Sequence, residues 1–165
     1  YRADGFRSDK EDVIAELAAT RSPKAVDALE WCADESQRAV EDAEKDVDKA
    51  YKKWKPVWDK ILEKEIAWAE QLQKRGLPVP KMRPKFPEDD KVAPLQVELN
   101  RAEKRVRDEL VLLDRLLTAT GELVVSLSSE EQAAVRARWT SKVLADRDWN
   151  VRARGYELLG HTSAD

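Results

Sequence analysis

Residue types that build catalytic and metal sites are scarce in this chain. Among its 165 residues there is one cysteine, Cys32, and one histidine, His161. A zinc site needs several cysteine or histidine ligands, and a Ser-His-Asp or Cys-His mechanism needs a histidine held by other elements. His161 instead follows Gly160, where a cation can interact with the terminal carbonyls of a helix. We therefore expect no metal, no cofactor and no enzyme active site.

Long apolar runs and glycines are scarce as well. No stretch approaches the ~18 apolar residues that can span a membrane, so no membrane association is expected. Five glycines together with 38% charged residues suit long helices better than a sheet. The net charge of −3 gives no global basic field and argues against nucleic acid as a partner. A lone cysteine leaves the redox compartment and the location open, and a cytoplasmic location is favoured.

Apolar residues recur at seven-residue intervals over two long stretches, residues 26–71 and 92–127. A repeat of that length predicts a helical seam flanked by charged, solvated surface. One short connection joins the stretches, so we expect an antiparallel coiled-coil hairpin closed within one chain. The seam of the first stretch is Val26, Leu29, Ala33, Ser36, Val40, Ala43, Val47, Ala50, Trp54, Val57, Ile61, Lys64, Trp68 and Gln71. That of the second is Val92, Leu95, Leu99, Ala102, Val106, Glu109, Leu113, Leu116, Thr120, Leu123 and Leu127.

The pairing of the two helices depends on where the hairpin folds. If it folds between Arg83 and Pro84, Ala50 lies near Leu116, so that a small residue faces a large one. On the same pairing Trp68 lies near Leu99.

Several residues predict where the helices begin and end. Ser22 with Pro23 opens the first long helix, and Gly76 ends it. Pro56 lies inside this helix but off the seam, so we expect a kink, with two separate helices as the alternative. Ser128 with Glu131 predicts a capping box at the start of a later helix.

A proline-rich tip, residues 76–91, connects the two long helices. Its prolines exclude helix over most of the segment and favour extended or polyproline backbone that buries little. Lys81 with the two prolines that follow at three-residue intervals has the spacing of a polyproline ligand. The alternatives are a stiff structural turn and another kind of protein contact. The candidate partner-binding residues are Lys81, Arg83, Pro84, Lys85, Phe86 and Pro87.

The two ends of the chain share a further pattern. In LAATRSPKAVDAL, residues 17–29, a short helix ends, a serine and a proline follow, and Ala-Val opens the next helix. In DRDWNVRARGYELLG, residues 146–160, an acidic residue precedes Val-Arg and a final Leu-Gly. The first segment resembles the turn and second helix of a HEAT repeat, and the second resembles a first helix. This resemblance implies a base of HEAT-like helices, and it is consistent with a piece of a longer solenoid.

Taken together, the sequence predicts an all-α fold in which a long antiparallel coiled-coil hairpin projects from a small HEAT-like base. The base comprises residues 8–34 and 129–165, and the hairpin comprises residues 35–128. The favoured function is a non-enzymatic protein–protein interaction or scaffold module with an unknown protein partner, acting as a monomer or weak dimer. One alternative is the non-catalytic part of a larger enzyme. Another is a nucleic-acid-binding repeat fragment that uses Arg136, Arg138, Lys142, Arg147, Arg152 and Arg154.

Overall fold

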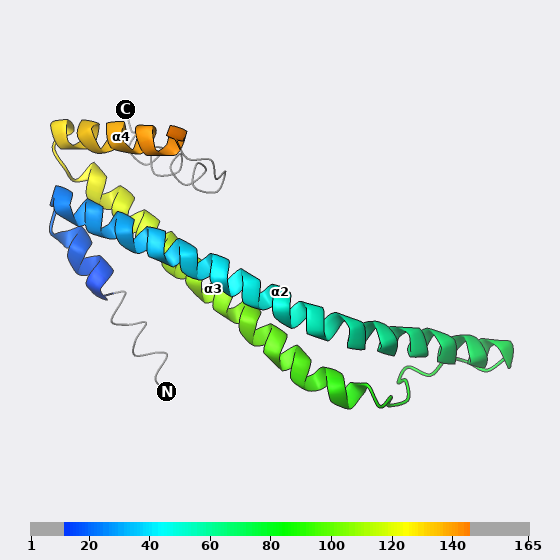
Figure 1. The fold of residues 1–165 in the computed structure, drawn as a ribbon. Helices are drawn as coiled ribbons and strands as arrows, with labels where there is room; N and C mark the ends of the chain where they lie inside the picture. The colour runs from blue at the N-terminus through cyan, green and yellow to red at the C-terminus, as the bar shows by residue number, and fades with distance from the viewer. Residues whose placement is uncertain (1–11, 146–165) are drawn as a thin grey trace. The chain divides into compact units, whose positions relative to one another are not determined.

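Helices make up nearly all of the computed structural model, which describes residues 12–145, and the side chains of residues 12–141. No strand occurs in this part of the chain. A first helix is described over residues 12–19, and α2 (Pro23–Lys74), α3 (Asp89–Val125) and α4 (Ser129–Ala145) follow (Figure 1). The two long helices, α2 and α3, pack against each other. The predicted all-α fold with a helical hairpin is thus confirmed. The helix expected within residues 146–160 and His161 lie outside the described residues.

The limits of α2 follow from local chemistry. Pro23 stands at its first position, where a missing backbone donor has no consequence. The helix continues without a break through Pro56, so one helix forms rather than two. At its end Gly76 has φ of 69°, and the N–H of Leu77 donates to the carbonyl of Leu72 at 3.0 Å. This left-handed glycine and the long-range bond form a Schellman motif, which confirms Gly76 as the end of the helix.

Contacts divide residues 12–145 into two compact units. The base unit comprises residues 12–38 and 110–145, and the hairpin unit comprises residues 39–109. The base unit therefore takes in the end of α3, which the sequence assigned to the hairpin.

The base unit encloses an apolar core built from both long helices and α4. Cys32 is half-buried against this core. Burying a large aliphatic side chain stabilises the fold by roughly 1.5–3 kcal/mol, so this core is the main source of stability in the unit. The core consists of Ala25, Val26, Leu29, Leu116, Ala119, Leu123, Val124, Leu127, Val135 and Trp139.

The start of α4 carries the predicted capping box. The backbone N–H of Ser128 donates to Oε2 of Glu131 at 3.0 Å, and the Ser128 hydroxyl donates to the same oxygen at 2.7 Å. The N–H of Glu131 points back to the Ser128 hydroxyl at 3.4 Å. Hydrogen bonds from Ser128 lower the pKa of the Glu131 carboxyl, because they favour its charged form. This charge also suits the positive end of the α4 dipole.

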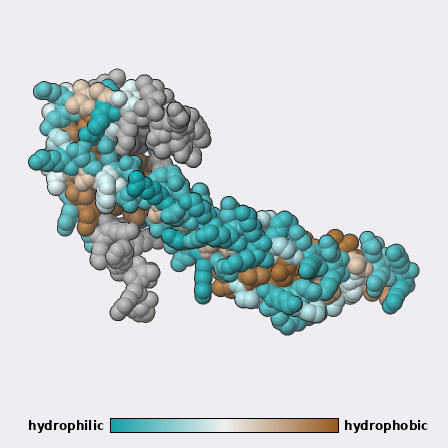
Figure 2. All heavy atoms as spheres, viewed as in Figure 1, coloured by the Kyte–Doolittle hydropathy of each residue, from teal (hydrophilic) through white to brown (hydrophobic). Residues whose placement is uncertain are grey.

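The seam of the hairpin unit follows the predicted seven-residue period. Val40, Ala43, Ala50, Ile61 and Leu99 are buried between α2 and α3. Figure 2 shows hydrophobic residues gathered where the two helices meet, with hydrophilic residues over most of the visible surface of α2. The period-seven pattern therefore identified the correct helix faces.

The predicted pairing of the two helices is wrong, although the faces are right. Asp46 pairs with Arg105 at 2.8 Å and Lys53 pairs with Glu98 at 2.6 Å. Partners on α3 are thus shifted by about 15 residues from the predicted pairing, under which Ala50 would face Leu116. The reason is the position of the fold, which lies at Gly76 and not between Arg83 and Pro84. The last turns of α2 extend past the start of α3, and the tip returns beside them (Figure 1).

Candidate partner-binding tip of the hairpin

Arg83 fastens the returning tip to both long helices. Its guanidinium donates two hydrogen bonds to the carboxylate of Asp89, at 2.9 and 2.6 Å, and Asp89 is the first residue of α3. Its Nε lies 3.3 Å from a carboxylate oxygen of Glu65 on α2. The guanidinium also donates to the carbonyl of Pro84 at 3.1 Å. A planar guanidinium with several donors suits such a junction, because it can bind carboxylates in two directions at once.

Asp89 in turn organises the start of α3. Its Oδ2 accepts a hydrogen bond from the backbone N–H of Phe86 at 2.7 Å, which is one half of a capping box. The Phe86 ring lies under the Arg83 guanidinium, with 5.1 Å between the guanidinium carbon and the ring centroid. The hydrogen bonds from Arg83, and then that from Phe86, lower the pKa of Asp89 to about 2. Asp89 is therefore ionised at neutral pH and bonded on both sides.

Two further ion pairs fix the end of the tip. Lys64 of α2 donates to Glu88, and this hydrogen bond lowers the pKa of the Glu88 carboxyl. Lys85 lies 2.6 Å from Asp90, and the bond raises the pKa of the lysine ammonium. Lys85 and Asp90 are both exposed, so this second pair is screened by water and salt.

Three apolar side chains face the solvent in the first part of the tip. Met82 is 86% exposed, Leu77 is 50% exposed and Val79 is 45% exposed. Prolines alternate with Leu77 and Val79 along this segment and restrict its backbone. None of these three residues is among the contact residues predicted from the sequence. The sequence nevertheless distinguishes this segment by its charge. Residues 71–87 contain five lysines and arginines and no acidic residue, although the chain as a whole is acidic.

The six predicted contact residues fall into two groups. Lys81, Lys85 and the prolines that follow at positions 84 and 87 are exposed, as a contact surface requires. Arg83 and Phe86 are half-buried and bonded to neighbouring residues, which corrects the expectation that the tip buries little. They hold the tip in place.

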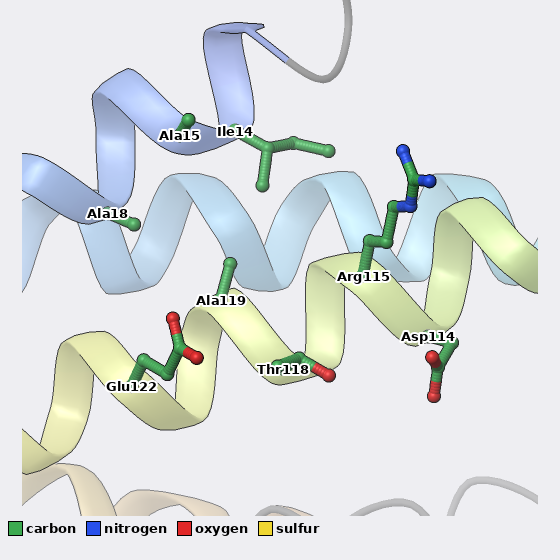
Figure 3. Close-up of a pocket in the computed structure, with 8 residues that line it drawn as sticks. All are labelled: Ile14, Ala15, Ala18, Asp114, Arg115, Thr118, Ala119 and Glu122. Carbon is green, nitrogen blue, oxygen red and sulfur yellow. The ribbon is translucent and has the colours of Figure 1, made fainter.

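The base unit contains an open groove between its first helix and α3. Its volume is about 450 Å³, and small side chains such as Ala18 and Ala119 line it. In Figure 3, Arg115 and Glu122 extend toward the first helix from either side of Ala119, whereas Asp114 points away. No histidine, cysteine or serine is among the lining residues.

The C-terminal arginines of the alternative hypothesis are only partly described. Arg138 pairs with Asp27 at 2.5 Å and with Glu30 at 2.7 Å, so its charge is offset within the base unit. Glu30 also accepts a hydrogen bond from the indole N–H of the buried Trp139. Arg147, Arg152 and Arg154 lie outside the described residues. Arg138 thus fastens α4 to α2.

Among residues 12–145, no three His, Cys, Asp or Glu side chains are arranged so that they could hold a metal ion. No helix there is both long enough and apolar enough to cross a membrane.

Comparison with known proteins gave no relatives. No family model matches the chain, and neither the curated proteins nor the solved structures contain a match.

Proposed function

We propose that this chain is a non-enzymatic interaction module that contacts a protein partner through the tip of its hairpin. The observation that carries the proposal is the exposure of Leu77, Val79 and Met82 on a loop that Arg83 and Asp89 hold in place. Apolar side chains exposed together on an ordered loop are typical of contact surfaces.

The supporting contacts favour binding through their effect on entropy. A mobile loop must lose conformational freedom when it binds, whereas a loop already fixed loses little. The alternating prolines and the Arg83 junction both reduce this loss. The exposed methionine is flexible and polarizable, and it can fill an irregular pocket on a partner.

Charge around the exposed residues indicates the kind of partner. Lys74, Arg75 and Lys81 flank the apolar side chains, and no acidic residue lies between positions 70 and 88. A protein surface with an apolar pocket and an acidic rim is complementary to this arrangement. The spacing of Lys81 with Pro84 and Pro87 also remains compatible with an aromatic groove that accepts polyproline segments.

Site-specific photocrosslinking in the native host tests the proposal. A photoreactive residue replaces Met82 in one variant and Lys104, an exposed residue on the outer face of α3, in the control. We expect one protein to be captured from position 82 and not from position 104. Capture of the same protein with equal yield from both positions would contradict a contact at the tip.

Binding of the captured protein is then measured with purified components. The triple variant Leu77→Ser, Val79→Ser and Met82→Ser should weaken binding at least about tenfold, because it removes the apolar contact. Val97→Ser is the matched control, because Val97 is a half-exposed apolar residue on α3 of the same unit. Unchanged affinity of the triple variant would rule out the tip as the contact surface.

A further inference from the structure

Charge is sharply segregated along the middle of α2. Residues 41–48 contain five acidic residues and one lysine, for a net charge of −4. Residues 49–60 contain five lysines and one aspartate, for a net charge of +4. Two adjacent blocks of equal and opposite charge thus follow each other on one helix.

The facing helix does not neutralise these blocks. The ion pairs Asp46–Arg105 and Lys53–Glu98 fix the register of α3 against α2. In that register residues 103–109 lie opposite the acidic block, and their three basic and three acidic residues cancel. Residues 91–102 lie opposite the basic block and add a net charge of +1. The hairpin unit therefore keeps one acidic segment and one basic segment side by side.

Part of each block lies on a single solvent-facing stripe of α2. Glu44, Asp48, Lys52 and Lys55 follow one another at spacings of three or four residues, which places them on one face of a helix. All four side chains are exposed. Lys55 bonds to Asp59 in the next turn at 2.8 Å, whereas no ion pair joins Glu44, Asp48 or Lys52 to another described residue.

We propose that a second copy of this chain docks on this stripe, with its α2 antiparallel to the first. A two-fold axis near Tyr51 sets Asp48 of one copy against Lys52 of the other, and Glu44 against Lys55. Each pair then occurs twice, because both copies use the same surface. Tyr51 is 45% exposed and lies near the boundary of the two blocks, where it adds apolar contact at the axis.

The sequence of charges favours a second copy over an unrelated partner. A partner of one sign would attract one block and repel the other, whereas the reversed copy is complementary to both. Exposed ion pairs contribute little individually and are screened by salt. The resulting dimer is therefore weak and sensitive to ionic strength.

Sedimentation equilibrium of the purified chain tests this dimer directly. We expect a monomer–dimer equilibrium at roughly 50 mM salt, with a dissociation constant at least about tenfold weaker at roughly 500 mM salt. A monomer at both salt concentrations would overturn the proposal. A dimer that is unaffected by salt would overturn it equally, because the contact would not rest on these charges.

Charge-swapped variants identify the surface. Lys52→Glu with Lys55→Glu should abolish the dimer, and so should Glu44→Lys with Asp48→Lys, because each variant then presents a single sign along the stripe. An equimolar mixture of the two variants should restore a heterodimer, because opposite stripes face each other again. Failure of the mixture to associate, with both variants folded by circular dichroism, would rule out the stripe as the interface.

Two controls guard against indirect effects. Lys104→Glu with Arg107→Glu makes the same change in net charge on α3, outside the stripe, and should leave the dimer intact. If a charge-swapped variant does not fold, Lys52→Gln with Lys55→Gln replaces it and should weaken the dimer at least about tenfold. A wild-type dissociation constant for this neutral variant would also refute the proposed surface.

Discussion

The guanidinium of Arg83 and the carboxylate of Asp89 form two parallel hydrogen bonds, of 2.9 and 2.6 Å, between the tip and the first turn of α3. The same carboxylate accepts the N–H of Phe86, so one aspartate both caps a helix and holds the loop that precedes it. This double role explains how a proline-rich tip can be ordered without a core of its own. The polar junction between Arg83 and Asp89 therefore holds the exposed apolar residues of the tip in position.

Acid should release this junction. Because the folded pKa of Asp89 is lowered to about 2 from an ordinary 3.8, its contribution to stability is complete above pH 3.8 and is lost as the pH falls toward 2. The amide of Phe86 reports the change, since Asp89 accepts its hydrogen bond. We expect hydrogen exchange at this amide, corrected for intrinsic rates, to accelerate over that pH interval. In Asp89→Asn the acceleration should already be present at neutral pH, and equal protection in both proteins would contradict the assigned role.

Removing the guanidinium should loosen the tip without unfolding the chain. Arg83→Gln deletes the bonds to Glu65 and Asp89, so proteolysis within residues 77–88 should become faster while helical circular dichroism stays the same. A protease that cleaves at neither arginine nor lysine keeps the comparison valid. Lys81→Gln is the control, because Lys81 is exposed and its replacement should leave the cleavage rate at the wild-type value.

The sequence predicted the helices and their buried faces, but it could not predict how the helices pair. Any shift by whole heptads sets apolar residues against apolar residues, and the error of about 15 residues is close to two heptads. The true register depends on side chains beside the seam, such as Asp46 and Arg105, and on the end of α2 at Gly76. Charged pairs beside a seam and a glycine at a helix end are each common in helical proteins. Only their combination determines how the two helices pair.

The tip shows a similar limit. Its prolines predicted a non-helical connection, and that prediction is correct for residues 77–88. The sequence did not reveal that Arg83 and Phe86 support the loop, because Glu65 becomes a neighbour of Arg83 only after the chain has turned back. Exposure of Met82 follows from the same geometry and could not be derived from the composition of the segment.

Leu29 and Trp31 lie within one turn of α2, and their truncation should distinguish a buried position from an exposed one. Leu29 is fully buried in the base unit, so Leu29→Ala should lower the free energy of unfolding by about 2–5 kcal/mol. Trp31 is 66% exposed, and Trp31→Ala should change it by no more than ~0.5 kcal/mol. Urea unfolding followed by circular dichroism measures both values. Similar losses for the two variants would mean that α2 is rotated relative to the core described above.

The hydrogen bond between Trp139 and Glu30 should contribute measurably to the attachment of α4. Trp139→Phe keeps an aromatic ring in the core but removes the indole N–H that donates to Glu30. We expect a loss of about 1–2 kcal/mol in the free energy of unfolding, because Glu30 retains only its bond to Arg138. Trp139→Phe in a Glu30→Ala background provides the comparison, because alanine has no side-chain acceptor for the indole N–H. If Trp139→Phe lowers the free energy of unfolding equally in the wild-type and Glu30-substituted backgrounds, the effect comes from packing and not from the hydrogen bond.

Crosslinking should establish the register of the hairpin. In a chain whose single cysteine is replaced by serine, Asp46→Cys with Arg105→Cys places two thiols at positions whose native side chains are 2.8 Å apart. A short bifunctional reagent should join them within one chain, giving a product of monomer mass. Ala67→Cys with Asn100→Cys is the matched control, because these residues would meet only under the pairing that sets Trp68 beside Leu99. Efficient crosslinking of the control pair, or products of dimer mass alone for the first pair, would exclude this register within a single chain. The result for the first pair also matters for the proposed dimer. The register that it tests determines which charged residues of α3 lie opposite the acidic and basic blocks of α2.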